Sequence, residues 1–265
     1  MGHSAWDYDM QGIGVPKGDV YGFKAVNKFG RAPEGIQVTR TDVWDRADSN
    51  GLQSIWLAPT EARQHIIISS SVNDTAGGTG MRTLRLYGLP NWGTKEVSEE
   101  ITLLGNVSTV ITATSYVIIH RMKGLTFGTG NSANLGVIHA VAQADSTVTA
   151  QINAKEGQTQ MAIYGVPSSQ TAFITQYYAT VNKAQGAAAS INMDLAANVE
   201  PDIQSTSYLI KNTRGIQSTG NSGDTWDFNP FFTCPGPCIL KVQGIANTAD
   251  VEVSAGFDLV LVDND

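Results

Sequence analysis

The sequence Thr-Ser-Tyr-Val-Ile-Ile-His at residues 114–120 is echoed by Thr-Ser-Tyr-Leu-Ile-Lys-Asn at residues 206–212. Each copy is followed by Thr-Gly-Asn-Ser, at residues 129–132 and 219–222. Aromatic and β-branched residues running into a Gly/Asn pair are typical of a strand that ends in a tight turn. Weaker echoes precede each copy. We therefore interpret the chain as two β units of the same kind.

Short apolar alternations separated by turn residues fill the chain from Ile36 onward, as in a sandwich or barrel. The clearest is the closing run of Val251, Val253, Phe257, Leu259 and Leu261, and helical periodicity is almost absent. The sequence predicts an all-β fold of two tandem jelly-roll-like antiparallel β-sandwiches. We expect the first sandwich over residues 36–133 and the second over residues 134–265.

The first 35 residues show neither the helical nor the strand period. They are rich in glycine, which disfavours a regular element, and they carry aromatic side chains that need a surface to pack on. One interpretation is a disordered terminus, and the other is an extended arm, residues 1–35, that lies along a neighbouring subunit. On the second interpretation the candidate interface residues of the arm are Trp6, Tyr8, Tyr21, Phe23 and Phe29.

Charge and hydropathy argue against two classes of partner. The formal net charge is -7, and basic residues form no cluster beyond residues 121–123, so nucleic acid is not an expected partner. No window approaches the roughly 18 to 20 apolar residues that cross a bilayer, so no membrane is expected either. The first residues are not those of a secretory signal, which predicts synthesis and folding in a cytoplasm.

Residues of the types used in catalysis are few and scattered. The four histidines are His3, His65, His120 and His139, and no two have metal-ligand spacing. The sequence Gly-Asn-Ser-Gly-Asp at residues 220–224 resembles a serine nucleophile turn, but its copy after residue 129 favours a turn used twice. Residues 77–80 are glycine-rich without the lysine of a phosphate-binding loop. We expect no catalytic residues and no cofactor.

A run of acidic residues is a candidate metal-binding loop. Asp42, Asp45, Asp48 and Asn50 place oxygen atoms close together, as calcium sites do. Their spacing is not that of an EF-hand, so a solvated loop is the preferred interpretation. We expect no metal site.

Cys234 and Cys238 enclose Pro-Gly-Pro and lack the second pair of ligands that zinc requires. Free thiols in a tight turn are preferred over a disulfide, because a reducing cytosol opposes the bridge.

Large aromatic residues outside the arm suggest a recognition surface. Trp44, Trp56, Trp92, Trp226 and the pair Tyr177 and Tyr178 are the candidates. Trp92 is the best of them because it lies between Asn91 and Gly93 in a predicted turn. An exposed tryptophan in a turn serves equally as an interface anchor or as a stacking platform for a sugar ring.

Three stretches resemble structural proteins of tailed bacteriophages whose roles are uncharacterised: residues 84–89, residues 96–105 and the closing residues 253–264. The resemblance covers most of residues 60–265 and rests on strand-and-turn patterns without reactive groups. It implies a β-sandwich component of the virion, either a capsid-decorating (cement) protein or a protein of the tail or neck. It transfers no functional residue.

The sequence hypothesis is a non-enzymatic virion protein that decorates a capsid. It would form a homo-oligomer, a trimer or a larger ring, and bind the major capsid protein or other virion subunits through its arm and loop tips. It would reach the virion by assembly in the cytoplasm of a bacterial host. The alternative is a tail, neck or tail-fibre component whose sandwich binds a carbohydrate receptor, with Trp92 and nearby tyrosines as the sugar face.

Overall fold

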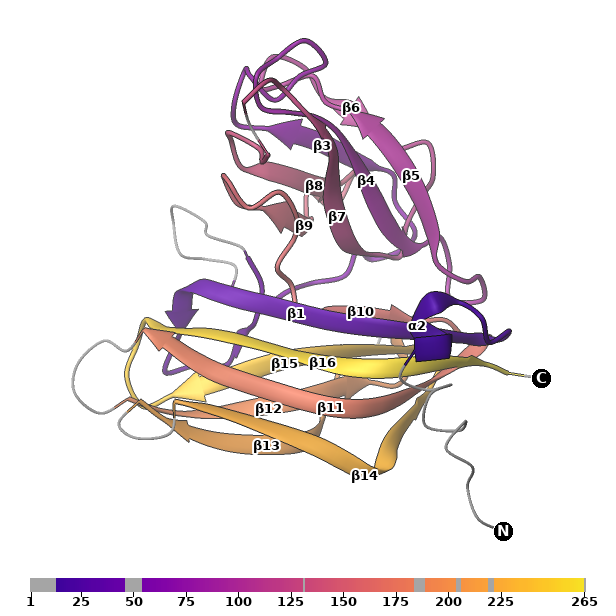
Figure 1. Cartoon of the computed structure of the whole chain (residues 1–265), viewed down its shortest axis with the longest axis vertical. Helices are drawn as coiled ribbons and strands as arrows, with labels where there is room; N and C mark the ends of the chain where they lie inside the picture. Colours follow the sequence, from indigo (N-terminus) through magenta and orange to yellow (C-terminus); the bar gives the residue numbers. More distant parts are fainter. Residues whose placement is uncertain are drawn as a thin grey trace.

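The computed structural model describes residues 13–45, 54–130, 132–183, 189–203, 206–218 and 222–264. Its strands form two bodies, an upper and a lower one in Figure 1. Every strand pair of the described residues is antiparallel, and the helical elements found among them are the short α2 (Val15–Lys17) and the 3-10 turn η2 (Pro201–Ile203). The all-β sandwich prediction is confirmed. No helix among these residues is long and apolar enough to cross a membrane.

The lower body is a sandwich of two sheets, with strand orders β1-β16-β11-β14 and β10-β15-β12-β13. Counting these eight strands 1 to 8 along the chain gives the orders 1-8-3-6 and 2-7-4-5, which is the strand order of a jelly roll. The short β2 adds to β15. The bounds are β1 (Phe23–Ile36), β2 (Thr41–Asp42), β10 (Ile163–Val166), β11 (Gln170–Lys183), β12 (Ser190–Asn198), β13 (Leu209–Gln217), β14 (Gly223–Pro235), β15 (Cys238–Ala246) and β16 (Val251–Asp263).

The upper body also consists of two sheets, with strand orders β6-β3-β8-β9 and β5-β4-β7. All of its strands lie in the sequence between β2 and β10. The upper sandwich is therefore inserted between the first two strands of the lower jelly roll, so the two are nested in the chain. The bounds are β3 (His65–Ser69), β4 (Met81–Leu89), β5 (Val97–Thr102), β6 (Val110–Ile111), β7 (Ile118–Phe127), β8 (Ile138–Ala142) and β9 (Val148–Ile152).

The strand pairing divides the chain differently from the expected boundaries at residues 35/36 and 133/134. Strand β8 pairs with β3 along its whole length, for example Ile67 with Ala140, which keeps β8 and β9 in the upper sandwich. Strand β1, expected within the arm, pairs with β16 from Phe23 to Ile36 and is an integral strand of the lower one. Both differences arise because pairing partners lie far apart in sequence, beyond the reach of local composition.

The repeated sequence of residues 114–120 and 206–212 leads into equivalent strand pairs. In the upper sandwich β7 pairs with β4, and in the lower one β13 pairs with β12. Leu86 of β4 and Leu195 of β12, which occupy corresponding places in the two copies, both face buried cores. The repetition thus marks a strand pair used twice, while the strand orders around it differ.

Strand β15 is buried on both faces of its sheet, which explains why its polar residues are inaccessible. Leu240 and Val242 point into the core of the lower sandwich, whereas Ile239 belongs to the core under the upper one, with Trp44 and Trp56. The upper sandwich therefore rests on the outer face of this sheet. As a result every residue of β15 except Ile245 is buried.

One glycine allows the close approach of β1 to this junction. A Cβ atom on Gly30 would lie 2.4 Å from the backbone N of Ala162 and 2.8 Å from the backbone O of Val43. Any side chain here would collide with backbone, so the glycine content that suggested a loose arm instead serves strand packing.

Candidate functional site

A cleft of about 830 Å³ lies where residues 54–62 and the Trp92 turn of the upper sandwich face the outer side of the β15 sheet. Its wall combines aromatic and proline rings with carboxyl, amide and hydroxyl groups. The residues that matter below are Trp92, Asn198, Asp202, Tyr208, Lys241 and Gln243. The volume lies within the range of small-molecule sites, about 300 to 1,000 Å³.

A buried ion pair forms the floor of the cleft. The ammonium of Lys241 donates to Asp42 Oδ2 at 2.8 Å, and both side chains are almost fully buried. The backbone N–H of Trp56 donates to the same carboxylate oxygen at 2.8 Å. The Lys241 ammonium also lies 3.9 Å from the centre of the Tyr208 ring, a cation–π contact. Lysine, carboxylate and tyrosine thus hold each other in place.

The Tyr208 phenol stays protonated over a wide pH range. Burial, with the negative charge of Asp42 as the next cause, raises its pKa well above the ordinary value of 10. The phenol is therefore a permanent hydrogen-bond donor at the cleft wall.

Trp92 is held rigidly on the opposite side. The N–H of Gly93 donates to the side-chain oxygen of Asn91 at 2.8 Å, which closes the turn. The N–H of Ser168, in the lower sandwich, donates to the backbone oxygen of Trp92 at 2.7 Å. The indole itself is half-buried and packs on the upper core. The prediction that Trp92 lies in a turn agrees with this geometry.

Several polar groups of the cleft are not used by the protein itself. Among the described residues, the side chains of Asp202, Thr206 and Gln243 have no hydrogen-bond or ion-pair partner. Gln243 of β15 lines the cleft and is only 2% exposed. Its amide can both donate to and accept from a molecule in the cleft.

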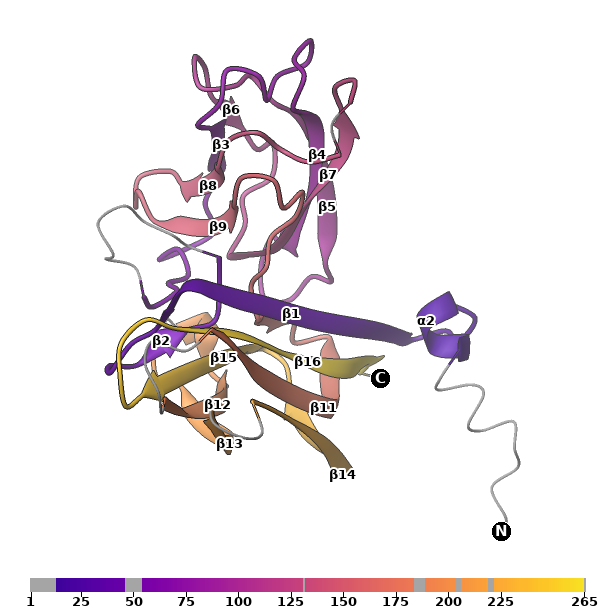
Figure 2. The same ribbon diagram turned by 60° about the vertical axis from the view of Figure 1, so that its left-hand side comes forward.

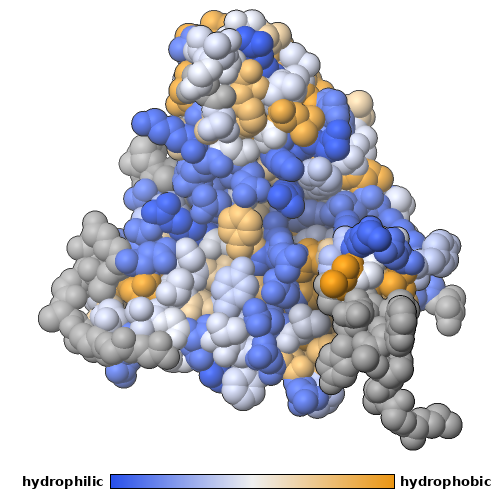
Figure 3. Space-filling model, viewed as in Figure 1, coloured by the Kyte–Doolittle hydropathy of each residue, from blue (hydrophilic) through white to orange (hydrophobic). Residues whose placement is uncertain are grey.

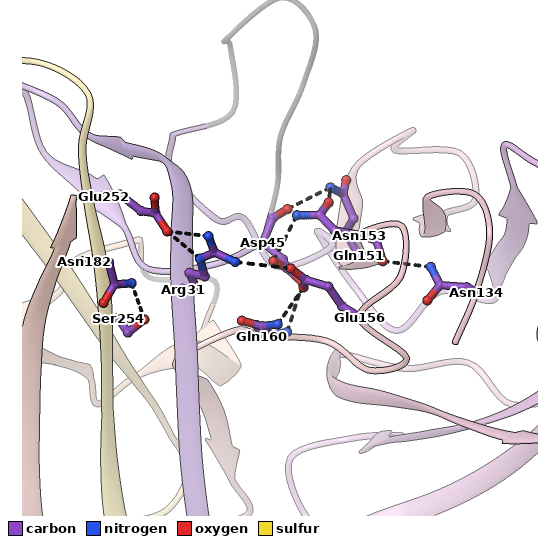
Figure 4. A network of polar contacts seen from close by, with 10 residues as sticks. All are labelled: Arg31, Asp45, Asn134, Gln151, Asn153, Glu156, Gln160, Asn182, Glu252 and Ser254. Atoms are coloured by element: carbon purple, nitrogen blue, oxygen red, sulfur yellow. Dashed lines mark hydrogen bonds and ion pairs between the residues drawn. The ribbon is translucent and has the colours of Figure 1, made fainter. Parts of the chain in front are cut away.

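Of the acidic run expected as a solvated loop, the described residues Asp42 and Asp45 are instead buried at the junction of the two sandwiches. Asp42 is held by Lys241, while Asp48 and Asn50 lie outside the described residues. Figure 4 shows Asp45 beside Glu156, surrounded by amide side chains and by Arg31, which bridges to Glu252. Asn153 Nδ2 donates to Asp45 Oδ1 at 3.1 Å. On the face drawn in Figure 3, hydrophilic residues gather where the upper and lower sandwiches meet.

Asp45 and Glu156 are neighbouring carboxyl groups at the junction. Burial, reinforced by the Glu156 charge and a hydrogen bond between the carboxyl groups, raises the pKa of Asp45 to about 8. A carboxyl that stays protonated at neutral pH serves as a donor, and here its partner is another side chain of the junction. Within the described part of the chain, no group of three or more His, Cys, Asp or Glu side chains is arranged to hold a metal ion.

The described histidines have structural surroundings. His65 is buried, and its burial lowers its pKa to about 4. His120 stacks on Tyr164 with the ring centres 4.3 Å apart, and its Nε2 lies 2.5 Å from Glu96 Oε2. The backbone oxygen of His120 accepts a hydrogen bond from the buried Lys28 of β1, so this cluster ties the two sandwiches together. His139 lies on β8, and His3 lies outside the described residues.

The expected interface residues divide into three groups. Trp6 and Tyr8 lie outside the described residues. Tyr21 is 97% exposed, Phe23 43% and Phe29 39%, so the described arm aromatics are available at the surface. The other aromatic candidates are mostly core: Trp44, Trp56 and Tyr177 are buried, whereas Trp226 is exposed on the edge strand β14 and lies under the guanidinium of Arg214.

Cys234 and Cys238 are both free and buried, with their sulfur atoms 2.8 Å apart. Cys234 lies near the end of β14 and Cys238 begins β15, where the chain crosses from one sheet to the other. The expected free thiols are what the structure contains.

Comparison with known proteins gives no identity. No protein-family model matches the chain, and no curated protein matches it. Among solved structures, the insecticidal delta-endotoxin Cry8Ea1 of Bacillus thuringiensis is 6% identical over 88% of this chain and 60% of that chain, with a TM-score of 0.22. Infectious bursal virus T=1 particles give 9% identity over 91% and 70%, with a TM-score of 0.22. The VP2 subviral particle of infectious bursal disease virus gives 10% identity over 92% and 73%, with a TM-score of 0.20. Similarity this low carries no argument about function.

Sequence reasoning identified Trp92 but not the cleft around it. The other walls come from residues 54–62, the β12–β13 connection and β15, which are distant in sequence. Tyr208 stands in the repeated motif, where its counterpart Tyr116 is fully buried in the upper core. Only the nested topology distinguishes the two tyrosines.

Proposed function

We propose that this chain is a non-enzymatic structural protein of a virus particle, which acts by binding copies of itself and other particle subunits. The support from the fold is the jelly-roll strand order of the lower sandwich, an architecture common among viral capsid proteins and lectins. The same architecture serves many unrelated functions, so the function of this chain depends on its surface.

The observation that carries the proposal is the uncovered N-terminal segment before β1. Figure 2 shows α2 and the start of β1 standing away from the sandwich. Ile13 is 63% and Tyr21 97% exposed, and Phe23 follows them on β1. Large apolar groups on a projecting segment gain burial only against another molecule, at about 25 cal/mol per Å² of apolar surface. The segment is suited to strap a neighbouring subunit.

The form of the molecule favours a decorating role on a capsid. The lower sandwich supplies the packing body and the strap, while the upper sandwich projects from it (Figure 1). The partners in this proposal are the major capsid protein, or other virion subunits, and further copies of the chain in a homo-oligomer such as a trimer. With the resemblance of residues 84–89 and 253–264, the proposed setting is a bacteriophage virion assembled in the host cytoplasm.

The proposed strap is the projecting segment from Ile13 to Phe23. It is tested by measuring the oligomeric state of the full chain by mass photometry and light scattering. A variant with Tyr21→Ser and Phe23→Ser removes apolar surface from the projecting segment. The expected result is assembly of the unchanged protein and at least about a tenfold weaker association of the variant, corresponding to about 1.4 kcal/mol.

The matched control is Val107→Ser, which removes an exposed apolar side chain, 83% accessible, from the upper sandwich. It should assemble like the unchanged protein. A chain that stays monomeric at every concentration, alone and with capsid protein, would refute the strap, and so would equal association of all three proteins.

A further inference from the structure

The cleft between the sandwiches has the chemistry of a binding site for a neutral sugar chain. Three features of the described residues lead to this conclusion: the balance of charge, the pairing of an aromatic ring with unused polar groups, and the rigidity of the walls. Each is independent of whether the protein assembles into particles.

Charge balance argues against an ionic ligand. Two basic side chains, Arg40 and Lys241, line the cleft, and so do two acidic ones, Glu61 and Asp202. Arg40 is paired with Asp194 at 2.7 Å and Lys241 with Asp42 at 2.8 Å, so both cations are already neutralised. Glu61 is paired with Arg63 at 2.8 Å. A phosphate or carboxylate ligand would find no free cation among the described lining residues, and a cationic ligand would find only the exposed Asp202 as an unpaired acid.

Unused hydrogen-bonding groups argue against a purely apolar ligand. Asp202 supplies acceptors, the Tyr208 phenol supplies a donor, and the Gln243 amide and Thr206 hydroxyl supply both. An apolar molecule would form hydrogen bonds with none of these groups. A molecule dense in hydroxyl groups, which donate and accept equally, satisfies the set.

The aromatic side chain supplies the remaining requirement. Sugar rings present apolar C–H faces together with a rim of hydroxyls, and they pack on the flat face of an aromatic ring while the rim bonds to polar neighbours. Trp92 is half-buried and fixed by the Asn91 and Ser168 contacts. The lower wall is fixed by the Asp42, Lys241 and Tyr208 cluster. Both walls are ordered before binding, which reduces the entropic cost of association.

We propose that the cleft between Trp92 and the outer face of the β15 sheet binds a neutral oligosaccharide. The volume of about 830 Å³ accommodates a few sugar units rather than one. Trp92 stacks on a ring, Asp202 and Tyr208 bond to its hydroxyl rim, and Gln243 bonds to the unit at the bottom of the cleft.

The test is binding of the full chain to a glycan array, followed by calorimetric titration with chitohexaose, cellohexaose, maltohexaose and any array hit. Trp92→Ala should weaken binding at least about tenfold through loss of the stacking surface. Asp202→Ala, at an exposed residue with no partner among the described residues, should weaken it several-fold without affecting folding.

Trp226→Ala is the matched control, because Trp226 is an exposed tryptophan on β14 that does not line the cleft. It should bind like the unchanged protein. If Trp92→Ala is poorly folded by circular dichroism, Asp202→Ala decides the question. Absence of binding to the array and to all three oligosaccharides overturns the proposal, as does binding that neither cleft variant weakens.

Discussion

Lys241 and Asp42 illustrate how the nested fold buries charge. Lys241 lies on β15 at a position that would face solvent in an isolated jelly roll, and the upper sandwich covers it. Ionised groups taken out of water are stable only when paired, and here the pairing includes the carboxylate, a backbone N–H and the Tyr208 ring. The pair therefore reports directly on the contact between the two sandwiches.

Removing one partner should be strongly destabilising. We expect Asp42→Ala to lower the free energy of unfolding by about 3–5 kcal/mol, because it leaves the Lys241 ammonium buried and unpaired. The exposed pair Lys17–Asp19 is the matched control, and Asp19→Ala should change the same quantity by less than about 1 kcal/mol. Urea unfolding followed by circular dichroism measures both. Equal effects of the two substitutions would show that the buried pair stabilises the fold no more than the exposed pair does.

Asp45 makes a pH-dependent contribution with a definite sign. Its pKa is raised to about 8 by burial and by Glu156, so the folded protein holds a proton that the unfolded chain loses near pH 4. The resulting stability is full below about pH 4 and is lost as the pH rises towards about 8. Asp45→Asn cannot titrate. The stability of the unchanged protein relative to this variant should therefore fall between pH 5 and pH 8 on the order of 1 kcal/mol or more and level off above. Parallel stability curves would contradict the assignment.

Strand β1 is an element that local sequence alone did not predict. Its glycines and aromatics predicted an arm, yet its register with β16 runs from Phe23 to Ile36. By contrast, the alternation of Val251, Val253 and Leu259 in β16 was readable, because a strand with one buried face carries its own period. Burial of β15 on both faces was not predictable, since the covering upper sandwich comes from another part of the chain. The cleft was missed for the same reason, and only its Trp92 turn was predictable.

Two deletions separate the strap from the strand. Removing residues 1–22 leaves every strand of the jelly roll, so we expect unchanged circular dichroism, a similar melting temperature and weakened assembly. Removing residues 1–36 deletes the first strand and exposes the edge of β16, so we expect insoluble or unfolded protein. A stable, soluble product of the longer deletion would contradict the place of β1 in the sandwich.

The whole molecule combines a lower jelly roll, an upper sandwich inserted into its chain and an exposed segment before β1. The nested order places the ends of the inserted sandwich together at the junction, where Arg31, Asp45 and Glu156 and the Lys28–His120 contact join the two bodies. These contacts hold the upper sandwich on the lower one, and the cleft lies between the two.

The central claim is that the chain is a structural component of a virus particle. The direct measurement is quantitative mass spectrometry of particles purified from a culture that produces the native protein. The account predicts many copies per particle, in a constant ratio to the major capsid protein through successive gradients. A few copies per particle would place the protein in the tail or neck instead of on the shell. Absence from washed particles, with the protein recovered in the soluble fraction, would contradict the account.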